Sequence, residues 1–318
     1  MTTARSAVSV RDLVKVFRGP GGKDLRAVDE VSFEVRVGEI FGLLGPNGAG
    51  KTTTLEIVEG IQEATSGTVT VLGVALPGGK GSIKRRIGVQ LQESAYLQRL
   101  TLEELLDLFG SFFSKKVDSA GLLASVGLEE KSKEAVMKLS GGQKRRFSLA
   151  ASLVNDPEIL FLDEPTSGLD PQGRRSIWNR ITAYKETGKT VVVTTHFMDE
   201  AEFLCDRVGV IDHGKLMALD TPLKLIRSLD SAYHIRFLTS RDDLPEERLV
   251  AIPGVVRLTK REIPDGVLFD LEIHDPAESL GPFTQVLAEL NLRPDDIRVE
   301  PATLEDVFLA ITGSELRD

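Results

Sequence analysis

Alternating and continuous apolar runs divide the first two thirds of the chain into predicted strands. Apolar and polar residues alternate at 8–10 and 31–37, which is the period of a strand with one buried face. Continuous apolar or β-branched runs at 40–44, 159–162 and 190–194 favour strands buried on both faces, as parallel sheets require. The pattern therefore predicts an α/β fold.

Helical periodicity separates these strands. Between residues 101 and 113 the apolar positions recur at three- and four-residue spacing, and they are Leu102, Leu105, Leu106, Phe109 and Phe112. Further elements are expected as strands at 68–72 and 87–91 and as helices after Lys51, after Gly142 and around 174–185. The pattern predicts an α/β core with a helical subdomain at about 95–155.

A composition change near residues 220–230 predicts a second, smaller domain. Its apolar runs predict strands at 232–238, 255–258, 266–273 and 297–300, and helices at 280–290 and 304–311. This mixture favours a small C-terminal α+β domain of ferredoxin-like type. A length of 318 residues fits two domains, which we place at 1–225 and 226–318.

The charge of the chain is unevenly distributed. The net charge is -9, and residues 231–318 hold 9 Lys and Arg against 18 Asp and Glu, so this segment carries the whole imbalance. Because nucleic-acid binding needs basic contacts to phosphate, we expect no nucleic-acid partner. The hydrophobic share of 41% and the charged share of 27% are typical of a globular protein.

Three features bear on the cellular compartment. No apolar run approaches the roughly 18 residues that a membrane-spanning helix needs. The first ten residues lack the basic start and apolar stretch of a signal peptide. The single cysteine, Cys205, cannot form an internal disulfide. Together they predict a cytoplasmic location.

One glycine-rich segment matches the phosphate-binding pattern G-x-x-x-x-G-K-[ST], and it consists of Gly45, Pro46, Asn47, Gly48, Ala49, Gly50, Lys51 and Thr52, followed by Thr53. The segment follows an apolar strand and opens a helix, which is the context that the motif requires. Backbone N–H groups of such a loop surround phosphate oxygens, and the helix N-terminus adds positive potential. Lys51 would contact the β- and γ-phosphates of ATP, and Thr52 would ligate Mg²⁺.

Two acids follow the buried strand at 159–162. Carboxylates at the carboxyl end of a strand lie at the crevice where α/β sheets bind ligands. Asp163 is suited to the Mg²⁺ site, and Glu164 is suited to act as general base for an attacking water.

A third segment has the sequence Leu139-Ser140-Gly141-Gly142-Gln143, which is the LSGGQ signature. Together with the phosphate loop and the two acids, this signature makes residues 8–220 resemble the ATP-binding cassette (ABC) ATPases. The resemblance implies a P-loop NTPase fold with a helical subdomain. In that family Ser140, Gly141, Gly142 and Gln143 would face the γ-phosphate bound to the other subunit. The resemblance therefore implies a homodimer or heterodimer that binds ATP and Mg²⁺.

The resemblance assigns roles to single residues as well. Phe17 is similar to the aromatic residue that stacks on adenine, and His196 to the switch histidine that contacts the γ-phosphate. Gln92 is similar to the Q-loop glutamine that senses Mg²⁺ and water, with Gln90 as a nearby alternative. Asp170 lies in a segment that resembles the D-loop, which acts across the dimer.

The chain has one phosphate loop and one signature, so it is expected to act as a dimer. Because no membrane span is predicted in it, a transporter built on it needs a separate membrane permease. The segments 64–68, 89–94 and 304–309 resemble ATPase subunits of daunorubicin-resistance and nodulation-type exporters. This implies a peripheral protein on the cytoplasmic face of the membrane, driving export of drugs or hydrophobic compounds. The permease would dock in a groove near Gln92, Tyr96, Leu97, Leu100 and Leu102. Leu102 could equally pack inside the helical subdomain, whereas Tyr96 and Leu97 precede the helix and are better candidates for exposure.

Two other functions compete with export. An importer ATPase is one alternative, although many of those have β-rich tails while this tail is predicted to be α+β. A soluble ABC ATPase acting on ribosomes or DNA is the other, but such proteins usually hold two cassettes or long coiled coils. A non-enzymatic role would need a damaged site, whereas Lys51, Asp163, Glu164, Ser140 and His196 are all present.

Overall fold

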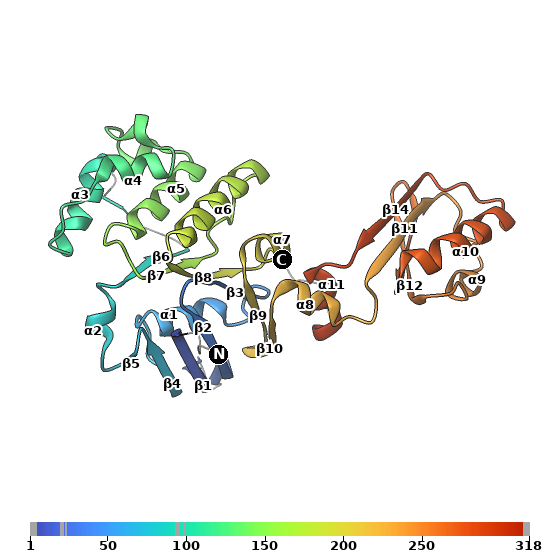
Figure 1. Cartoon of the computed structure of the whole chain (residues 1–318), viewed down its shortest axis with the longest axis horizontal. Coiled ribbons are helices and arrows are strands. Elements are labelled where there is room, and N and C mark those ends of the chain that lie inside the picture. Colours follow the sequence, from blue (N-terminus) through green and yellow to red (C-terminus); the bar gives the residue numbers. More distant parts are fainter. Residues whose placement is uncertain (1–4, 20–21, 23, 93–95, 98, 314–318) are drawn as a thin grey trace. The chain divides into compact units, whose positions relative to one another are not determined.

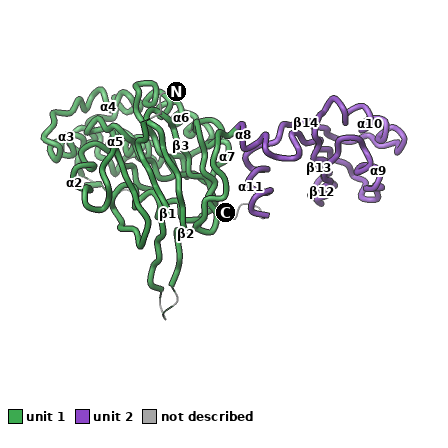
Figure 2. The backbone as a smooth tube through the Cα atoms, turned by 60° about the horizontal axis from the view of Figure 1, so that its bottom comes forward, with its two compact units in different colours: residues 1–222, 316–318 green, residues 223–315 purple. Residues whose placement is uncertain are grey.

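The structure is a computed structural model that describes residues 5–19, 22, 24–92, 96–97 and 99–313. It contains two compact units, one extending to Pro222 and one beginning at Leu223, which Figure 2 shows in different colours. In the described part of the chain, no helix is both long and apolar enough to cross a membrane.

A six-stranded sheet forms the centre of the first unit (Figure 1). Its order is β10 (Lys215–Asp220), β9 (Arg207–Asp212), β3 (Ile40–Leu44), β8 (Thr190–Thr195), β7 (Ile159–Asp163) and β6 (Ile87–Gln90). All neighbouring strands are parallel except β10, which pairs with β9 in the antiparallel sense. Every residue of β3, β7 and β8 is buried, as the continuous apolar runs predicted.

A second, antiparallel sheet packs against the first. It consists of β2 (Asp24–Arg36), β1 (Ser6–Arg18), β4 (Ser66–Val71) and β5 (Val74–Leu76), in that order. The two sheets share one apolar core, in which the rings of Phe33 and Phe41 stack at 5.2 Å. Strands β1 and β2 are longer than predicted because register shifts interrupt the alternation, and Asp12 and Glu30 have positive φ there.

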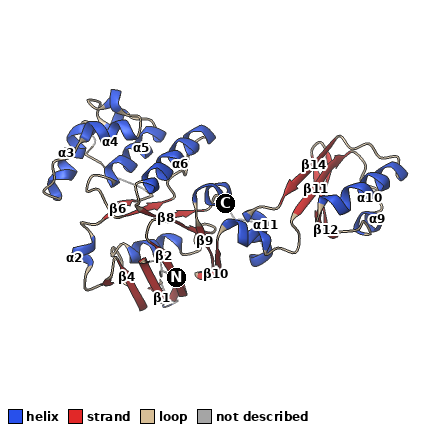
Figure 3. Ribbon diagram, in the orientation of Figure 1, coloured by secondary structure: helices blue, strands red, loops and turns tan. Residues whose placement is uncertain are grey.

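Seven α-helices belong to the described part of the first unit. They are α1 (Lys51–Val58), α2 (Lys80–Ile83), α3 (Leu102–Phe112), α4 (Ser119–Ser125), α5 (Gly141–Ser152), α6 (Pro171–Glu186) and α7 (Met198–Leu204). Figure 3 shows α3, α4 and α5 grouped together, which corresponds to the predicted helical subdomain. Capping boxes begin α3 at Thr101 and α5 at Ser140.

The second unit has the ferredoxin-like order of elements. After α8 (Pro222–Arg227), its elements are β11 (Tyr233–Thr239), α9 (Glu246–Val250), β12 (Val255–Ile263), β13 (Gly266–Ile273), α10 (Pro276–Glu289), β14 (Asp296–Pro301) and α11 (Leu304–Thr312). The sheet order is β12-β13-β11-β14, and all neighbours are antiparallel. Phe237, Phe269 and Phe283 form the centre of its core.

An ionic cluster joins α11 to this sheet. His234 on β11 lies 2.8 Å from Asp270 Oδ1 through Nδ1 and 3.3 Å from Asp306 Oδ1 through Nε2. Burial lowers the pKa of His234, but hydrogen bonds and charges from the two carboxylates outweigh burial and raise the pKa to about 9. At neutral pH the protonated imidazole therefore connects β13 to α11.

Candidate nucleotide site

The topology of the central sheet brings three predicted motifs to one edge. Strands β3, β8 and β7 are adjacent and parallel, with Leu44 beside Thr195 and Asp163 beside Thr194. Their carboxyl ends continue into the phosphate loop, the segment with Glu164 and the segment with His196. Ligands of α/β sheets bind at this edge.

Lys51 lies inside its own loop. Its Nζ donates hydrogen bonds to the carbonyl oxygens of Gly45 at 2.7 Å and Pro46 at 3.1 Å. Only 4% of the residue is exposed, and burial lowers the pKa of Lys51 while the charges of Glu164 and Asp163 oppose this shift. The ammonium group is thus held at the first turn of α1, where the loop amides converge.

The glycines of the loop are required by close packing and by backbone conformation. A Cβ on Gly45 would lie 2.1 Å from the carbonyl oxygen of Ile211. Gly50 has a φ of 99°, and a Cβ there would lie 2.3 Å from the carbonyl oxygen of Ala27. Side chains at these positions would displace the loop from β9 and β2.

Thr52 and Asp163 lie side by side. The Thr52 hydroxyl donates to Asp163 Oδ1 at 3.2 Å, and the Thr194 hydroxyl donates to the same oxygen. Asp163 is 3% exposed. Two oxygen ligands of the kind that Mg²⁺ prefers are therefore next to each other beside the phosphate loop.

The Glu164 carboxylate is the meeting point of the predicted catalytic residues. Its Oε1 lies 3.4 Å from Lys51 Nζ and 3.2 Å from His196 Nδ1, and its Oε2 accepts from Gln92 Nε2 at 3.5 Å. The hydrogen bond from His196 is the main cause that lowers the pKa of Glu164, and it outweighs the raising effect of burial, with the Lys51 charge also contributing. The group is therefore ionised at neutral pH.

The structure favours Gln92 over Gln90 for the Q-loop role. Gln90 is the last residue of β6, and it is 1% exposed. Gln92 is exposed and reaches Glu164.

The signature residues form an exposed helix N-terminus. Ser140 Oγ accepts from the Gln143 amide at 3.3 Å, and Gln143 Oε1 accepts from the Ser140 amide at 2.9 Å. Ser140 and Gly141 are exposed, and Gly142 is partly exposed. The helix is therefore capped by its own side chains while its first turn faces solvent.

Asp170 and Phe17 lie on other elements. Asp170 is the N-cap of α6, and its Oδ1 accepts from the Gly173 amide at 2.7 Å. Phe17 is partly exposed near the end of β1, with Lys15 Nζ 4.9 Å from its ring centroid. One face of the Phe17 ring therefore already has a cationic neighbour.

Arg145 is a residue of this region that the motifs did not indicate. Its guanidinium contacts the carbonyl oxygens of Gln92, Glu164 and Pro165. The only available signal was a basic residue shortly after the signature, and charged residues at such positions are common on helix surfaces.

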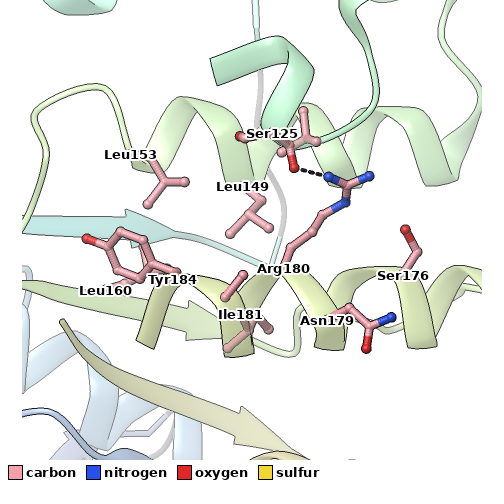
Figure 4. A pocket seen from close by; sticks show the side chains of 11 residues that line it. Ser125, Leu149, Leu153, Leu160, Ser176, Asn179, Arg180, Ile181 and Tyr184 are labelled. Atoms are coloured by element: carbon pink, nitrogen blue, oxygen red, sulfur yellow. Dashed lines mark hydrogen bonds between the residues drawn. The ribbon is translucent and has the colours of Figure 1, made fainter. Parts of the chain in front are cut away.

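A separate pocket of about 530 Å³ lies between α4, α5, α6 and β7 (Figure 4). Its apolar lining includes Leu149, Leu153, Leu160 and Ile181, and Arg180 at its side donates to the carbonyl oxygen of Ser125. The residues of the nucleotide site do not line it.

Comparison with known proteins agrees with this geometry. The family model described as ABC transporter matches residues 28–167. The Nod factor export ATP-binding protein I of Ralstonia nicotianae is 41% identical over 92% of this chain and 90% of its own length. The linearmycin resistance ATP-binding protein LnrL of Bacillus subtilis is 38% identical over 92% of this chain and 95% of its own length.

Solved structures show the same fold in the first unit. The ATP-binding cassette MJ0796, in a dimeric post-hydrolysis state bound to ADP and Pi, has a TM-score of 0.62 and 27% identity. The match covers 67% of this chain and 98% of that one. The predicted α/β P-loop fold is therefore confirmed, and the chain belongs to the ABC transporter family as an ATP-binding protein that hydrolyses ATP.

Proposed function

We propose that this chain is the ATP-hydrolysing subunit of an ABC exporter whose catalytic base is Glu164. The observation that carries the catalytic assignment is the convergence of Lys51, Gln92 and His196 on one carboxylate. An ionised carboxylate can accept a proton from a water that attacks the γ-phosphate.

The loop residues Gly45 to Thr53 bind the phosphates of ATP in this proposal. Backbone amides and the α1 N-terminus surround the phosphate oxygens, and Lys51 supplies a full positive charge. Lys51 now pairs with Glu164 at 3.4 Å. A γ-phosphate would compete for the same ammonium group, so nucleotide binding would free Glu164 to accept a proton.

Mg²⁺ fits the pair formed by Thr52 and Asp163, with Gln92 close by. When bound, Mg²⁺ would neutralise charge on the β- and γ-phosphate oxygens. No group of three or more His, Cys, Asp or Glu side chains suited to a metal is found among the described residues. Mg²⁺ at a nucleotide needs only one or two protein carboxylates, because phosphates and waters complete its shell.

We infer that two subunits complete each ATP site. The exposed, capped N-terminus of α5 presents Ser140, Gly141 and Gly142 to a second subunit. Such a terminus favours an anion. MJ0796 has been solved as a dimer, which supports this assembly. Phe17 would stack on adenine, and Asp170 would lie at the subunit boundary.

Export is favoured over import and over a soluble role by the relatives. The Nod factor export protein and LnrL match more than nine tenths of this chain, so the similarity extends into the second unit. We propose a separate permease, a position on the cytoplasmic face of the membrane, and a hydrophobic or drug-like cargo.

Exposure and packing reduce the number of residues that could line the predicted permease-docking groove. Leu97 is 60% exposed and is the best candidate for an apolar contact. Tyr96 packs edge-on against Phe147 at 5.2 Å, so it has a packing role of its own. Leu102 is completely buried, which agrees with the alternative that it packs inside the helical subdomain and does not face a permease.

Reconstitution tests the function. The chain should release phosphate from Mg·ATP when purified, and co-expression with its permease should add ATP-dependent movement of an amphiphilic fluorescent dye in inverted vesicles. Movement into such vesicles is export from the cell. Movement out of them would indicate an importer, and ATPase activity that is never accompanied by dye movement after co-expression would favour the soluble alternative.

A further inference from the structure

Arg145 makes an unusual set of contacts for a residue on a helix surface. From the second turn of α5, Nη1 donates to the Gln92 carbonyl at 2.7 Å and Nε to the Pro165 carbonyl at 3.0 Å, while Nη2 donates to the Glu164 carbonyl. All three acceptors are backbone oxygens of loops beside the nucleotide site. One guanidinium therefore links the signature helix, the Q-loop and the segment after β7.

The backbone of Glu164 explains why such a contact matters. Its φ is 45°, a left-handed conformation that is uncommon for a residue with a side chain. Conformations of this kind are strained and persist only where surrounding contacts enforce them. Something in the structure must therefore hold Glu164 in place.

Both ends of the residue are held. On its amino side, the Glu164 amide donates to the carbonyl oxygen of Thr194 at 3.2 Å and to its hydroxyl at 3.1 Å. On its carboxyl side, the Glu164 carbonyl accepts from the Ser167 amide at 3.2 Å and from Arg145, which also binds the next carbonyl at Pro165. Arg145 is thus the side-chain contact that ties this turn to another element of the fold.

We propose that Arg145 is a positioning residue, which holds Glu164 in its left-handed conformation and couples it to the Q-loop and the signature helix. The inference rests on the proposed role of Glu164 as the base. The signature lies at the start of α5, which begins at Gly141. If a partner subunit displaced this end of the helix, the Arg145 side chain would transmit the displacement to the Glu164 carbonyl. Lysine could not replace this contact, because it lacks the planar set of donors that spans three carbonyls.

The adjacent Arg146 provides a matched control. Its Nη1 donates to the carbonyl oxygens of Val126 and Gly127, each at 3.0 Å, at the end of α4. It thus has the same chemistry as Arg145, one position away, but among the described residues its guanidinium hydrogen-bonds to the end of α4 and not to the nucleotide site.

The test compares Arg145→Ala, Arg145→Gln and Arg145→Lys with Arg146→Ala in steady-state ATPase assays. We expect the Arg145 variants to lose about 10–100-fold in kcat, as a misplaced catalytic group would, with KM for ATP within about twofold of wild type. Guanidinium at millimolar concentration should restore part of the activity of Arg145→Ala. Arg146→Ala should keep kcat within about twofold, even where its melting temperature falls.

A double variant separates this inference from the proposed function. If Arg145 acts through Glu164, adding Arg145→Ala to Glu164→Gln should cost less than about threefold further in single-turnover hydrolysis. A further tenfold loss, or an Arg145→Gln variant with wild-type kcat, would overturn the positioning role. If Glu164→Gln itself hydrolyses ATP at the wild-type rate, the assignment of the base fails instead. If Arg145→Ala does not fold, Arg145→Gln and Arg145→Lys decide the outcome through the same kcat and KM values.

Discussion

His196 Nδ1 lies 3.2 Å from Oε1 of Glu164, the same oxygen that lies 3.4 Å from Lys51 Nζ. His196 follows β8, Lys51 begins α1 after β3, and Glu164 follows β7. These side chains meet because β3, β8 and β7 end at the same edge of the sheet. If ATP binds as proposed, its γ-phosphate would compete with the Glu164 carboxylate for the Lys51 ammonium group.

Lys51→Ala should abolish most ATP turnover. The change removes a charge that would contact the β- and γ-phosphates and leaves the Glu164 carboxylate without its lysine partner. Phosphate release at saturating Mg·ATP measures the effect, and Lys84→Ala, at the exposed position directly after α2, is the control. Normal turnover by Lys51→Ala would contradict the phosphate-binding assignment.

Glu164→Gln should bind ATP and hydrolyse it slowly, so that ATP-bound dimers accumulate. Glutamine keeps the shape of the side chain but cannot accept the proton of the attacking water. Light scattering coupled to size exclusion, with and without ATP, checks this, and Glu130→Gln at an exposed position of the helical subdomain is the control. A Glu164→Gln chain that stays monomeric with ATP would count against the two-subunit site.

Ser140→Arg should block hydrolysis and spare nucleotide binding to the single chain. The large side chain would stand where the partner's γ-phosphate binds, while Lys51 belongs to the chain's own site. Mixing Ser140→Arg with Lys51→Ala creates dimers with one doubly damaged site and one intact site. Activity should partly return in the mixture. A mixture that remains inactive would show that both sites must cycle together or that Ser140 does not act across the dimer.

The second unit should lose stability at alkaline pH because His234 loses its proton there. The pKa of His234 rises from 6.5 to about 9 on folding, so its contribution is full below pH 6.5 and is lost as the pH rises through 9. The contribution should be on the order of 1–2 kcal/mol, because solvent reaches part of the cluster and weakens its charge interactions. Hydrogen exchange in α11 should therefore be faster in His234→Gln than in wild type at pH 6. The difference should nearly vanish at pH 10, and an equal difference at both values would refute the ionic explanation.

Leu97→Asp should weaken recruitment to membranes that contain the permease, with basal ATPase nearly intact. A charge at this exposed position would oppose burial in an apolar interface. Flotation of the bound protein with vesicles measures recruitment, and Leu25→Asp, at an equally exposed position on β2, is the control. If removal of residues 233–318 releases the protein while Leu97→Asp does not, the dock lies elsewhere.

The sequence was most informative where local chemistry dictates the structure. The glycine spacing before Lys51 predicted a strand, loop and helix because only that arrangement places the amides around a phosphate. The buried runs that became β3, β8 and the first four residues of β7 were equally clear, because all their residues are apolar or β-branched. Register shifts hid the true lengths of β1 and β2.

Contacts between distant segments were not predictable in the same way. Strand β9 and the short helix α7 follow the switch segment without a motif of their own. The role of Arg145 depends on the carbonyl directions of residues 92, 164 and 165, which no side-chain pattern encodes. The burial of Leu102 was open for a related reason, since a helical apolar stripe does not say which residues face a partner.

Few side chains other than serine could replace Ser140 at the start of α5. A serine hydroxyl can accept the Gln143 amide through a lone pair and still offer its own hydrogen to an incoming phosphate oxygen. Aspartate caps a helix equally well, yet it would repel the phosphate, and alanine would lose both interactions. If Ser140 acts across the dimer as proposed, one small side chain both begins α5 and binds the neighbour's nucleotide, and few other side chains could do both.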